Sequence, residues 1–90
     1  KFKGGVLDPE VEIETLRQLR QALGQAVPLR IDPNCAWSVE TSVKVGRDLA
    51  GELSGGGYLE DPCVGLDGMA EVRRRLMADG IETPLASNVA

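Results

Sequence analysis

The region from residue 9 to residue 23 carries apolar residues at the spacing of a helix. They lie three or four positions apart and would form one face: Ile13, Leu16, Leu19 and Leu23. Asp8 is a favourable N-cap, Pro9 suits the first helical position, and Gly24 suits a C-terminal stop. The pattern therefore predicts an amphipathic helix with one buried face.

Two more helices are predicted further along the chain. Ser38 can cap the first of them, which is interrupted by the glycine-rich residues 54–57. Asp67 can cap the second, and Gly80 follows it. Their apolar positions are Val39, Val43, Leu49 and Leu53 in the first helix and Met69, Val72 and Leu76 in the second.

Short apolar runs separate these helices and predict buried strands. They cover residues 27–31, 58–59 and 83–86, and an earlier strand is expected to end at Lys3. Strands and helices then alternate along the whole chain, which predicts a parallel sheet with right-handed crossover connections. The expected fold class is α/β, in the order βαβαβαβ.

Composition agrees with a globular domain and narrows the function. Of the 90 residues, 42% are hydrophobic and 27% are charged, and with only three aromatic residues the core must be aliphatic. The net charge of -4 argues against nucleic-acid binding, and the lack of a long apolar run argues against a membrane span. Two cysteines are too few for a disulfide framework, so we expect a cytoplasmic protein.

Each predicted strand ends in a polar residue. Lys3, Asp32, Glu60 and Asn88 are separated by 29, 28 and 28 residues, which is one β/α unit each time. In a parallel α/β protein the carboxyl ends of the strands share one edge, where active sites form. We therefore expect these four side chains at the same level on the same face.

The types of these side chains suggest a metal site beside a base. Asp32, Glu60 and Asn88 offer three oxygen ligands, which favour Mg²⁺, with Mn²⁺ as an alternative and Ca²⁺ as a weaker one. Lys1 shares the strand face of Lys3, and two ammonium groups next to a cation should lower a lysine pKa. Such a pair suits removal of a proton alpha to a carboxylate, because the metal stabilises the resulting enediolate.

Taken singly, these motifs have ordinary explanations. Lys-x-Lys is commonly a solvated edge, and Asp-Pro-Asn or Glu-Asp-Pro is commonly a turn. The shared spacing favours a site, since independent turns have little reason to repeat at one unit length. Trp37 is interpreted as a packing residue. Cys35 and Cys63 are interpreted as bystanders, because the chain has no histidine to activate a thiol.

Four motifs follow one another along the chain: residues 1–7 (KFKGGVL), 32–34 (DPN) with 36–38 (AWS), 58–63 (YLEDPC) and 86–88 (ASN). In this order and at these spacings they resemble the glucarate dehydratase branch of the enolase superfamily, and the resemblance covers the whole chain. Asn as the third ligand points to this branch, whereas Cys35 stands where the family usually has Gly and Ser87-Asn88-Val89 where it has Thr-Asn-Met. The segment after Cys63 is also shorter than in the best-known members.

The resemblance implies a Mg²⁺-dependent lyase that dehydrates a hexarate such as glucarate to a 5-keto-4-deoxy product. It implies that Asp32, Glu60 and Asn88 bind the metal, with Asn88 also near the substrate. Lys3 resembles the base that takes the alpha proton. Lys1 resembles a carboxylate-binding partner that tunes the pKa of Lys3, and Asn34 resembles a substrate contact.

The resemblance also implies that residues 1–90 are about half of a TIM-like (β/α)₇β barrel, from the end of strand 2 to strand 5. The capping domain and a His-Asp pair on later strands would lie outside, so these residues alone should be inactive. The expected partners are a small acid-sugar substrate and other copies of the full-length protein. Two alternatives stay open: another enolase-superfamily racemase, epimerase or dehydratase, and a non-catalytic α/β binding module.

Overall fold

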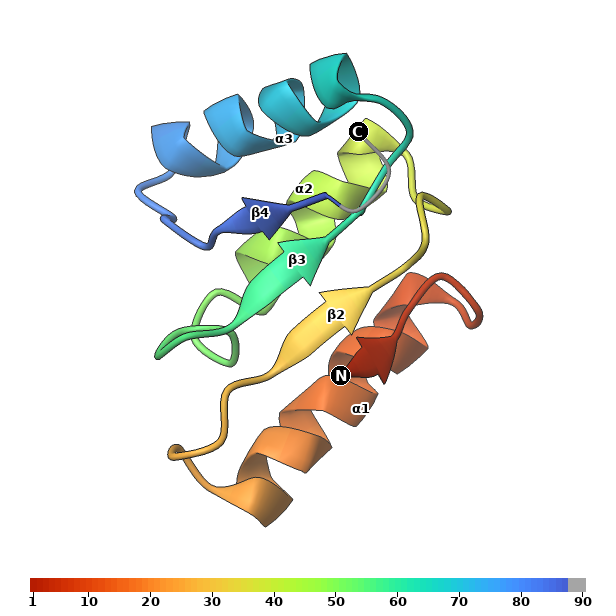
Figure 1. Cartoon of the computed structure of the whole chain (residues 1–90). Coiled ribbons are helices and arrows are strands. Elements are labelled where there is room, and N and C mark those ends of the chain that lie inside the picture. Colours follow the sequence, from red (N-terminus) through yellow and green to blue (C-terminus); the bar gives the residue numbers. More distant parts are fainter. Residues whose placement is uncertain (88–90) are drawn as a thin grey trace.

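The computed structural model describes residues 1–87 and shows strands and helices in strict alternation (Figure 1). The predicted order is confirmed. None of the helices in this part of the chain has the length and hydropathy needed to cross a bilayer. The elements are β1 (Phe2–Lys3), α1 (Pro9–Leu23), β2 (Arg30–Asp32), α2 (Val39–Asp48), β3 (Tyr58–Glu60), α3 (Leu66–Ala78) and β4 (Leu85–Ala86).

The strands of residues 1–87 form one parallel sheet in the order β1-β2-β3-β4. Strands that follow one another in the chain are therefore neighbours in the sheet, and their arrowheads point the same way in Figure 1. This confirms the α/β fold class. Adjacent placement of successive strands is also the arrangement of consecutive β/α units in a barrel.

The first helix begins and ends where the sequence predicts. The side chain of Asp8 accepts a hydrogen bond from the backbone N–H of Glu10 at 2.9 Å. Gly24 ends the helix with φ 78°, a left-handed backbone that favours glycine. Ile13 and Leu16 are buried, but Leu23 is 47% exposed, so its predicted place on the apolar face is wrong. It is the last residue of the helix.

The strands around residues 27–31 and 83–86 are shorter than predicted. Only Arg30–Asp32 and Leu85–Ala86 pair in the sheet. Pro28 and Pro84 have no N–H group to donate to a neighbouring strand. The carbonyl of Val27 accepts a hydrogen bond at 2.7 Å from the guanidinium of Arg20 in α1 and so pairs with this helix and not with a neighbouring strand.

The second and third helices differ from prediction at one end each. Ser38 caps α2 as predicted, accepting from the N–H of Thr41 at 3.0 Å, but the helix ends at Asp48. Leu49 and Leu53 are buried in the turn that follows. The predicted cap of α3 at Asp67 is wrong, because the helix begins at Leu66 and Gly65 occupies the cap position. Asp67 lies instead in the first turn, where the helix dipole favours an acid.

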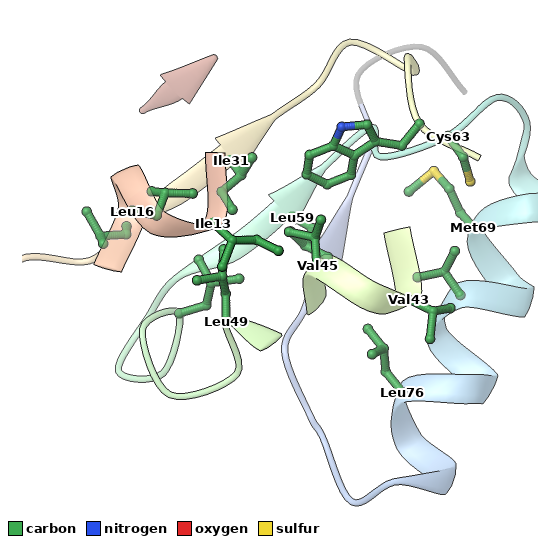
Figure 2. Close-up of a cluster of buried hydrophobic side chains, with 14 residues drawn as sticks. Ile13, Leu16, Ile31, Val43, Val45, Leu49, Leu59, Cys63, Met69 and Leu76 are labelled. Atoms are coloured by element: carbon green, nitrogen blue, oxygen red, sulfur yellow. The ribbon is translucent and has the colours of Figure 1, made fainter. Parts of the chain in front are cut away.

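The helices and the sheet meet in an aliphatic core (Figure 2). Burial of apolar surface on this scale supplies the main driving force for folding. Trp37 is 7% exposed within the core, which confirms its interpretation as a packing residue. The members from the strands and helices include Ile13 and Leu16 of α1, Ile31 of β2, Val43 and Val45 of α2, Leu59 of β3, and Met69, Val72 and Leu76 of α3.

The sheet register places the predicted polar residues in one row. Lys3 is opposite Asp32, and Ile31 is opposite Leu59, so that Asp32 and Glu60 continue that alignment. Leu59 and Ile31 face the core, and alternation along the strands turns Asp32 and Glu60 to the other face. In the fourth strand the residue opposite Glu60 is Ala86. Asn88, predicted as the fourth member, lies outside the described residues.

Candidate metal centre

Three buried carboxylates meet at the carboxyl ends of β2 and β3. Asp32, Glu60 and Asp61 each offer an oxygen atom, and these atoms all lie within 4.8 Å of one another. The three residues are 6%, 4% and 4% exposed. We call this group the acidic cluster. Carboxylates that are close and buried repel each other and are costly to desolvate, so a cation is needed to balance them.

Lys1 supplies positive charge to the cluster from β1's end of the sheet. Its Nζ atom lies 3.5 Å from Oδ2 of Asp32 and 3.3 Å from Oε1 of Glu60. The contact with Glu60, followed by the weaker one with Asp32, raises the pKa of Lys1 above its ordinary value. The lowered lysine pKa expected beside a bound cation stays a prediction. At Lys1 the charged neighbours within 4 Å are carboxylates, and they favour its charged form.

Lys3 ends β1 at the level of the cluster. It pairs in register with Asp32 and is exposed. Phe2, between the two lysines, packs against the core. Because side chains alternate along a strand, Lys1 and Lys3 share the opposite face with Asp32. The sheet thus places Lys1, Lys3 and Asp32 on one face at β1 and β2, and Glu60 follows on β3.

The loop after β2 orients Asp32. The backbone N–H of Asn34 donates a hydrogen bond to Oδ1 of Asp32 at 3.0 Å, closing an Asx turn. Asn34 has φ 53°, a left-handed conformation that asparagine tolerates better than most residues. Asn34 is exposed, and its backbone contacts the cluster through Asp32. Its role as a substrate contact stays a prediction.

Asp61 was not predicted as a site residue. Strict strand alternation would turn its side chain away from that of Glu60. Its φ of 46° breaks the alternation, and its carboxylate joins those of Asp32 and Glu60. The N–H of Asp61 donates to the carbonyl of Ala86 at 2.8 Å, and its carbonyl accepts from the N–H of Cys35 at 2.7 Å. The sequence did offer a signal for Asp61 as a site residue, because it is an acid between the predicted ligand Glu60 and Pro62.

The two cysteines lie near the cluster without forming a disulfide. Cys63 is 3% exposed, and burial raises the pKa of its thiol, which keeps it protonated and unreactive. Cys35 is partly exposed and has φ 65°. This geometry supports the interpretation of Cys63 as a bystander. The left-handed φ of Cys35 favours glycine, which gives a physical reason for a glycine at position 35.

The donor set of the cluster fits a hard divalent cation. Its ligand atoms are carboxylate oxygens, which suit Mg²⁺ and also Mn²⁺, and it contains no sulfur or imidazole ligand that would favour zinc. Asp32 and Glu60, two of the three predicted ligands, belong to it. The third predicted ligand, Asn88, follows β4 and lies outside the described residues.

The parallel α/β sheet carries its acidic residues at the carboxyl ends of the strands, the edge where active sites form in such folds. Residues 1–88 match the family described as Enolase C-terminal domain-like. The chain therefore belongs to this family. The match covers nearly all of its length, including β1 with its two lysines and the acidic cluster.

Individual relatives agree with the family match. The chain is 48% identical over 89 residues to a probable glucarate dehydratase of Streptomyces coelicolor, covering 99% of this chain and 19% of the relative. An isomerase from the same species, of known structure, is 45% identical with a TM-score of 0.77 over 96% of this chain and 21% of its own. An enolase from Bradyrhizobium in complex with magnesium and mandelic acid is 26% identical with a TM-score of 0.79, over 94% and 22%. The chain spans about a fifth of the length of these relatives.

Proposed function

We propose that this chain supplies the metal-binding strands of a Mg²⁺-dependent acid-sugar dehydratase, a carbon–oxygen lyase. The observation that carries the proposal is the buried acidic cluster with Lys1 and Lys3 beside it on the same sheet face. The 48% identity to a probable glucarate dehydratase supports glucarate or a related hexarate as the substrate.

In this proposal Asp32, Glu60 and Asn88 hold the metal ion. Asp61 adds a third carboxylate close to the first two and strengthens the attraction for a cation. A bound divalent cation would offset negative charge on the substrate carboxylate as the alpha proton leaves. Mn²⁺ is the alternative, since it accepts the same oxygen donors.

The lysines and Asn34 would act on the substrate. Lys3 takes the alpha proton as its free amine. The hydroxyl on the neighbouring carbon accepts a proton from the protonated Lys3 or from the second base in another part of the enzyme, and leaves as water. Lys1, which already contacts two carboxylates, binds the carboxylate of the substrate and tunes Lys3. Asn34 and Asn88 contact the substrate beside the metal. The exposed position of Asn34 and its backbone hydrogen bond to Asp32 support this role.

On this proposal residues 1–90 are the part of a barrel domain from the end of strand 2 to strand 5. The second base and the capping domain would be contributed by other parts of the enzyme. The 90 residues alone should then show no dehydratase activity. A cytoplasmic location and assembly into homo-oligomers remain predictions for the full-length protein.

A graft tests the proposal. In the graft, this chain replaces the matching segment of the probable glucarate dehydratase of Streptomyces coelicolor, and loss of glucarate is followed with the parent enzyme as positive control. Asp32→Asn keeps the shape of the side chain but removes one ligand charge, and should lower kcat roughly a thousandfold. Asp67→Asn, an exposed aspartate of α3, is the matched control and should have no effect.

Two results would contradict the proposal. One is an unsubstituted graft that folds and binds Mg²⁺ but does not dehydrate glucarate or any other hexarate. The other is an Asp32→Asn graft with full activity. A second candidate function, racemisation or isomerisation at the same metal site, is favoured by the 45% identity to an isomerase. Exchange of the alpha proton with deuterated solvent without loss of water would identify it.

A further inference from the structure

Glu12 is a buried acid that the proposed chemistry does not use. It lies in α1, is 1% exposed, and has no basic partner among residues 1–87. Its carboxylate instead accepts three backbone hydrogen bonds. The N–H of Gly5 donates to Oε1 at 3.0 Å, and the N–H groups of Val6 and Leu7 donate to Oε2 at 3.0 and 2.9 Å. Glutamate is rarely buried in this way, and hydrogen bonds to a charged group are among the stronger ones.

The three donors belong to the loop that directly follows Lys3. Apolar packing does not hold this loop, because Val6 is 76% exposed and Leu7 is 55% exposed. The contacts with Glu12 are therefore the main bonds between residues 5–7 and the rest of the domain. Without them, three N–H groups would lose their partners in a partly buried setting.

The same loop is tightly fitted on its other side. The N–H of Gly4 donates to the carbonyl of Asp32 at 3.0 Å. Gly5 has φ 77°, and a Cβ atom there would come within 2.7 Å of the Cβ of Ala36 and 2.9 Å of the carbonyl oxygen of Pro33. The backbone after Lys3 is thus held between Glu12 and the loop that carries Asp32. A shift of the backbone after Lys3 would therefore move Lys3 relative to Asp32.

We propose that Glu12 is a positioning residue for the base Lys3, an inference that rests on the proposed dehydratase function. Its carboxylate holds the β1–α1 loop, and the loop fixes the backbone of Lys3 relative to Asp32. Misplacement of a catalytic group by about 1 Å can lower a rate about a hundredfold. Glu12 therefore contributes to the rate without contacting the substrate.

Glu12→Gln in the graft tests this role. Glutamine has the same shape but only one acceptor oxygen, and its amide N–H₂ would face a backbone donor. We expect kcat to fall about 10- to 100-fold. KM and the affinity for Mg²⁺ should stay within about twofold, because neither substrate nor metal contacts Glu12. Amide hydrogen exchange at residues 5–7 should become faster.

Two further variants make the test specific. Glu14→Gln changes an exposed glutamate two residues along the same helix and should leave kcat unchanged. Leu7→Pro removes one of the three N–H donors at an exposed residue and should give a smaller fall in kcat with KM unchanged. It also provides the test if Glu12→Gln does not fold.

The outcomes separate this inference from the proposed function. If the unsubstituted graft dehydrates a hexarate, the proposed function stands, and the variants alone judge Glu12. Glu12→Gln and Leu7→Pro with normal kcat, at temperatures where both are folded, would show a purely structural role and overturn the inference. If the unsubstituted graft folds, binds Mg²⁺ and is inactive on every hexarate, the proposed function fails and takes the inference with it.

Discussion

The Nζ atom of Lys1 lies 3.3 Å from Oε1 of Glu60, although β1 and β3 are not neighbours in the sheet. The lysine side chain reaches across β2, where it also contacts Asp32 at 3.5 Å. An ammonium group therefore stands between two carboxylates that we propose as metal ligands. It competes with a divalent cation for the same negative charge.

Lys1→Gln should consequently have opposite effects on metal binding and on activity. Loss of the ammonium should tighten Mg²⁺ binding roughly two- to fivefold, a modest gain because the side chain is 39% exposed. In the graft the same change should lower kcat/KM, because a carboxylate-binding charge is lost. Calorimetric titration with Mg²⁺ and steady-state kinetics measure the two effects. Lys44→Gln is the control, since Lys44 pairs with Glu10 and Asp48 on the helices. Unchanged or weaker Mg²⁺ binding by Lys1→Gln would be inconsistent with this competition.

Asp61→Asn should weaken Mg²⁺ binding roughly tenfold, the scale of effect seen for groups that support metal ligands. The change removes one negative charge from the acidic cluster. Asparagine tolerates the left-handed backbone at this position, with φ 46°, so the fold should be retained. Titration with Mg²⁺, with Asp67→Asn as control, measures the difference. Equal Mg²⁺ affinities of Asp61→Asn and Asp67→Asn would show that Asp61 does not contribute to the metal site.

Cys35→Gly should stabilise the chain. Cys35 has φ 65°, which costs a residue with a Cβ atom roughly 1–2 kcal/mol. Glycine avoids that cost but loses more entropy on folding, so we expect a net gain of about 0.5–1 kcal/mol in the free energy of unfolding. Chemical denaturation measures it. Cys35→Ser removes the thiol but keeps the strain, and should show no gain. A similar gain from both variants would mean that the thiol, and not the backbone, is responsible.

Arg20→Met should destabilise the chain by about 2–4 kcal/mol. Arg20 is 5% exposed and donates to the carbonyls of Gly24, Val27 and Glu52, so its loss removes three partly buried hydrogen bonds from a charged donor. Arg17→Met is the control, because Arg17 is exposed and makes a single 3.3 Å bond to the carbonyl of Asp48. Thermal and chemical unfolding compare the two. Equal stability of the two variants would contradict a structural role for Arg20.

Glu71 should make stability depend on pH in acid. Arg74 and then Arg75 lower the pKa of Glu71 from 4.5 to about 2. A lowered pKa in the folded state means that the stabilisation is complete above pH 4.5 and is lost as the pH falls towards 2. Glu71→Gln should therefore melt below the unsubstituted chain at pH 7, and the gap should close near pH 2. The difference should be small and should shrink in high salt, because these ion pairs are on the surface.

The control for Glu71 is Glu14→Gln on α1. Glu14 is exposed and has no ion pair among residues 1–87. The difference in melting temperature between Glu14→Gln and the unsubstituted chain should therefore be nearly the same at every pH. A gap for Glu71→Gln that stays constant between pH 7 and pH 2 would show that the arginines do not hold its charge.

The sequence by itself determined the order of elements and part of the site. The spacing of Ile13 and Leu16 and the cap at Asp8 act within a single helix, so local physics was enough to predict α1. The spacing of one β/α unit between Asp32 and Glu60 predicted that these two side chains lie close together, because successive strands of a parallel sheet end at the same edge. The predicted strands around residues 27–31 and 83–86 were too long. Their length depends on tertiary contacts such as the hydrogen bond from Arg20 to the carbonyl of Val27, and on prolines that cannot donate to the sheet.

Only the tertiary structure decided the details on which catalysis would depend. The direction of the Asp61 side chain follows from a left-handed backbone held by bonds to two neighbouring segments, and strand alternation predicts the opposite direction. In the sequence Glu12 is one of several acids near the N-terminus of α1, and only the fold brings three N–H groups to its carboxylate. The raised pKa of Lys1 likewise depends on two carboxylates from other strands, Glu60 and then Asp32. Each of these contacts joins residues that the chain brings together only by folding, and local sequence patterns carry little information about such pairs.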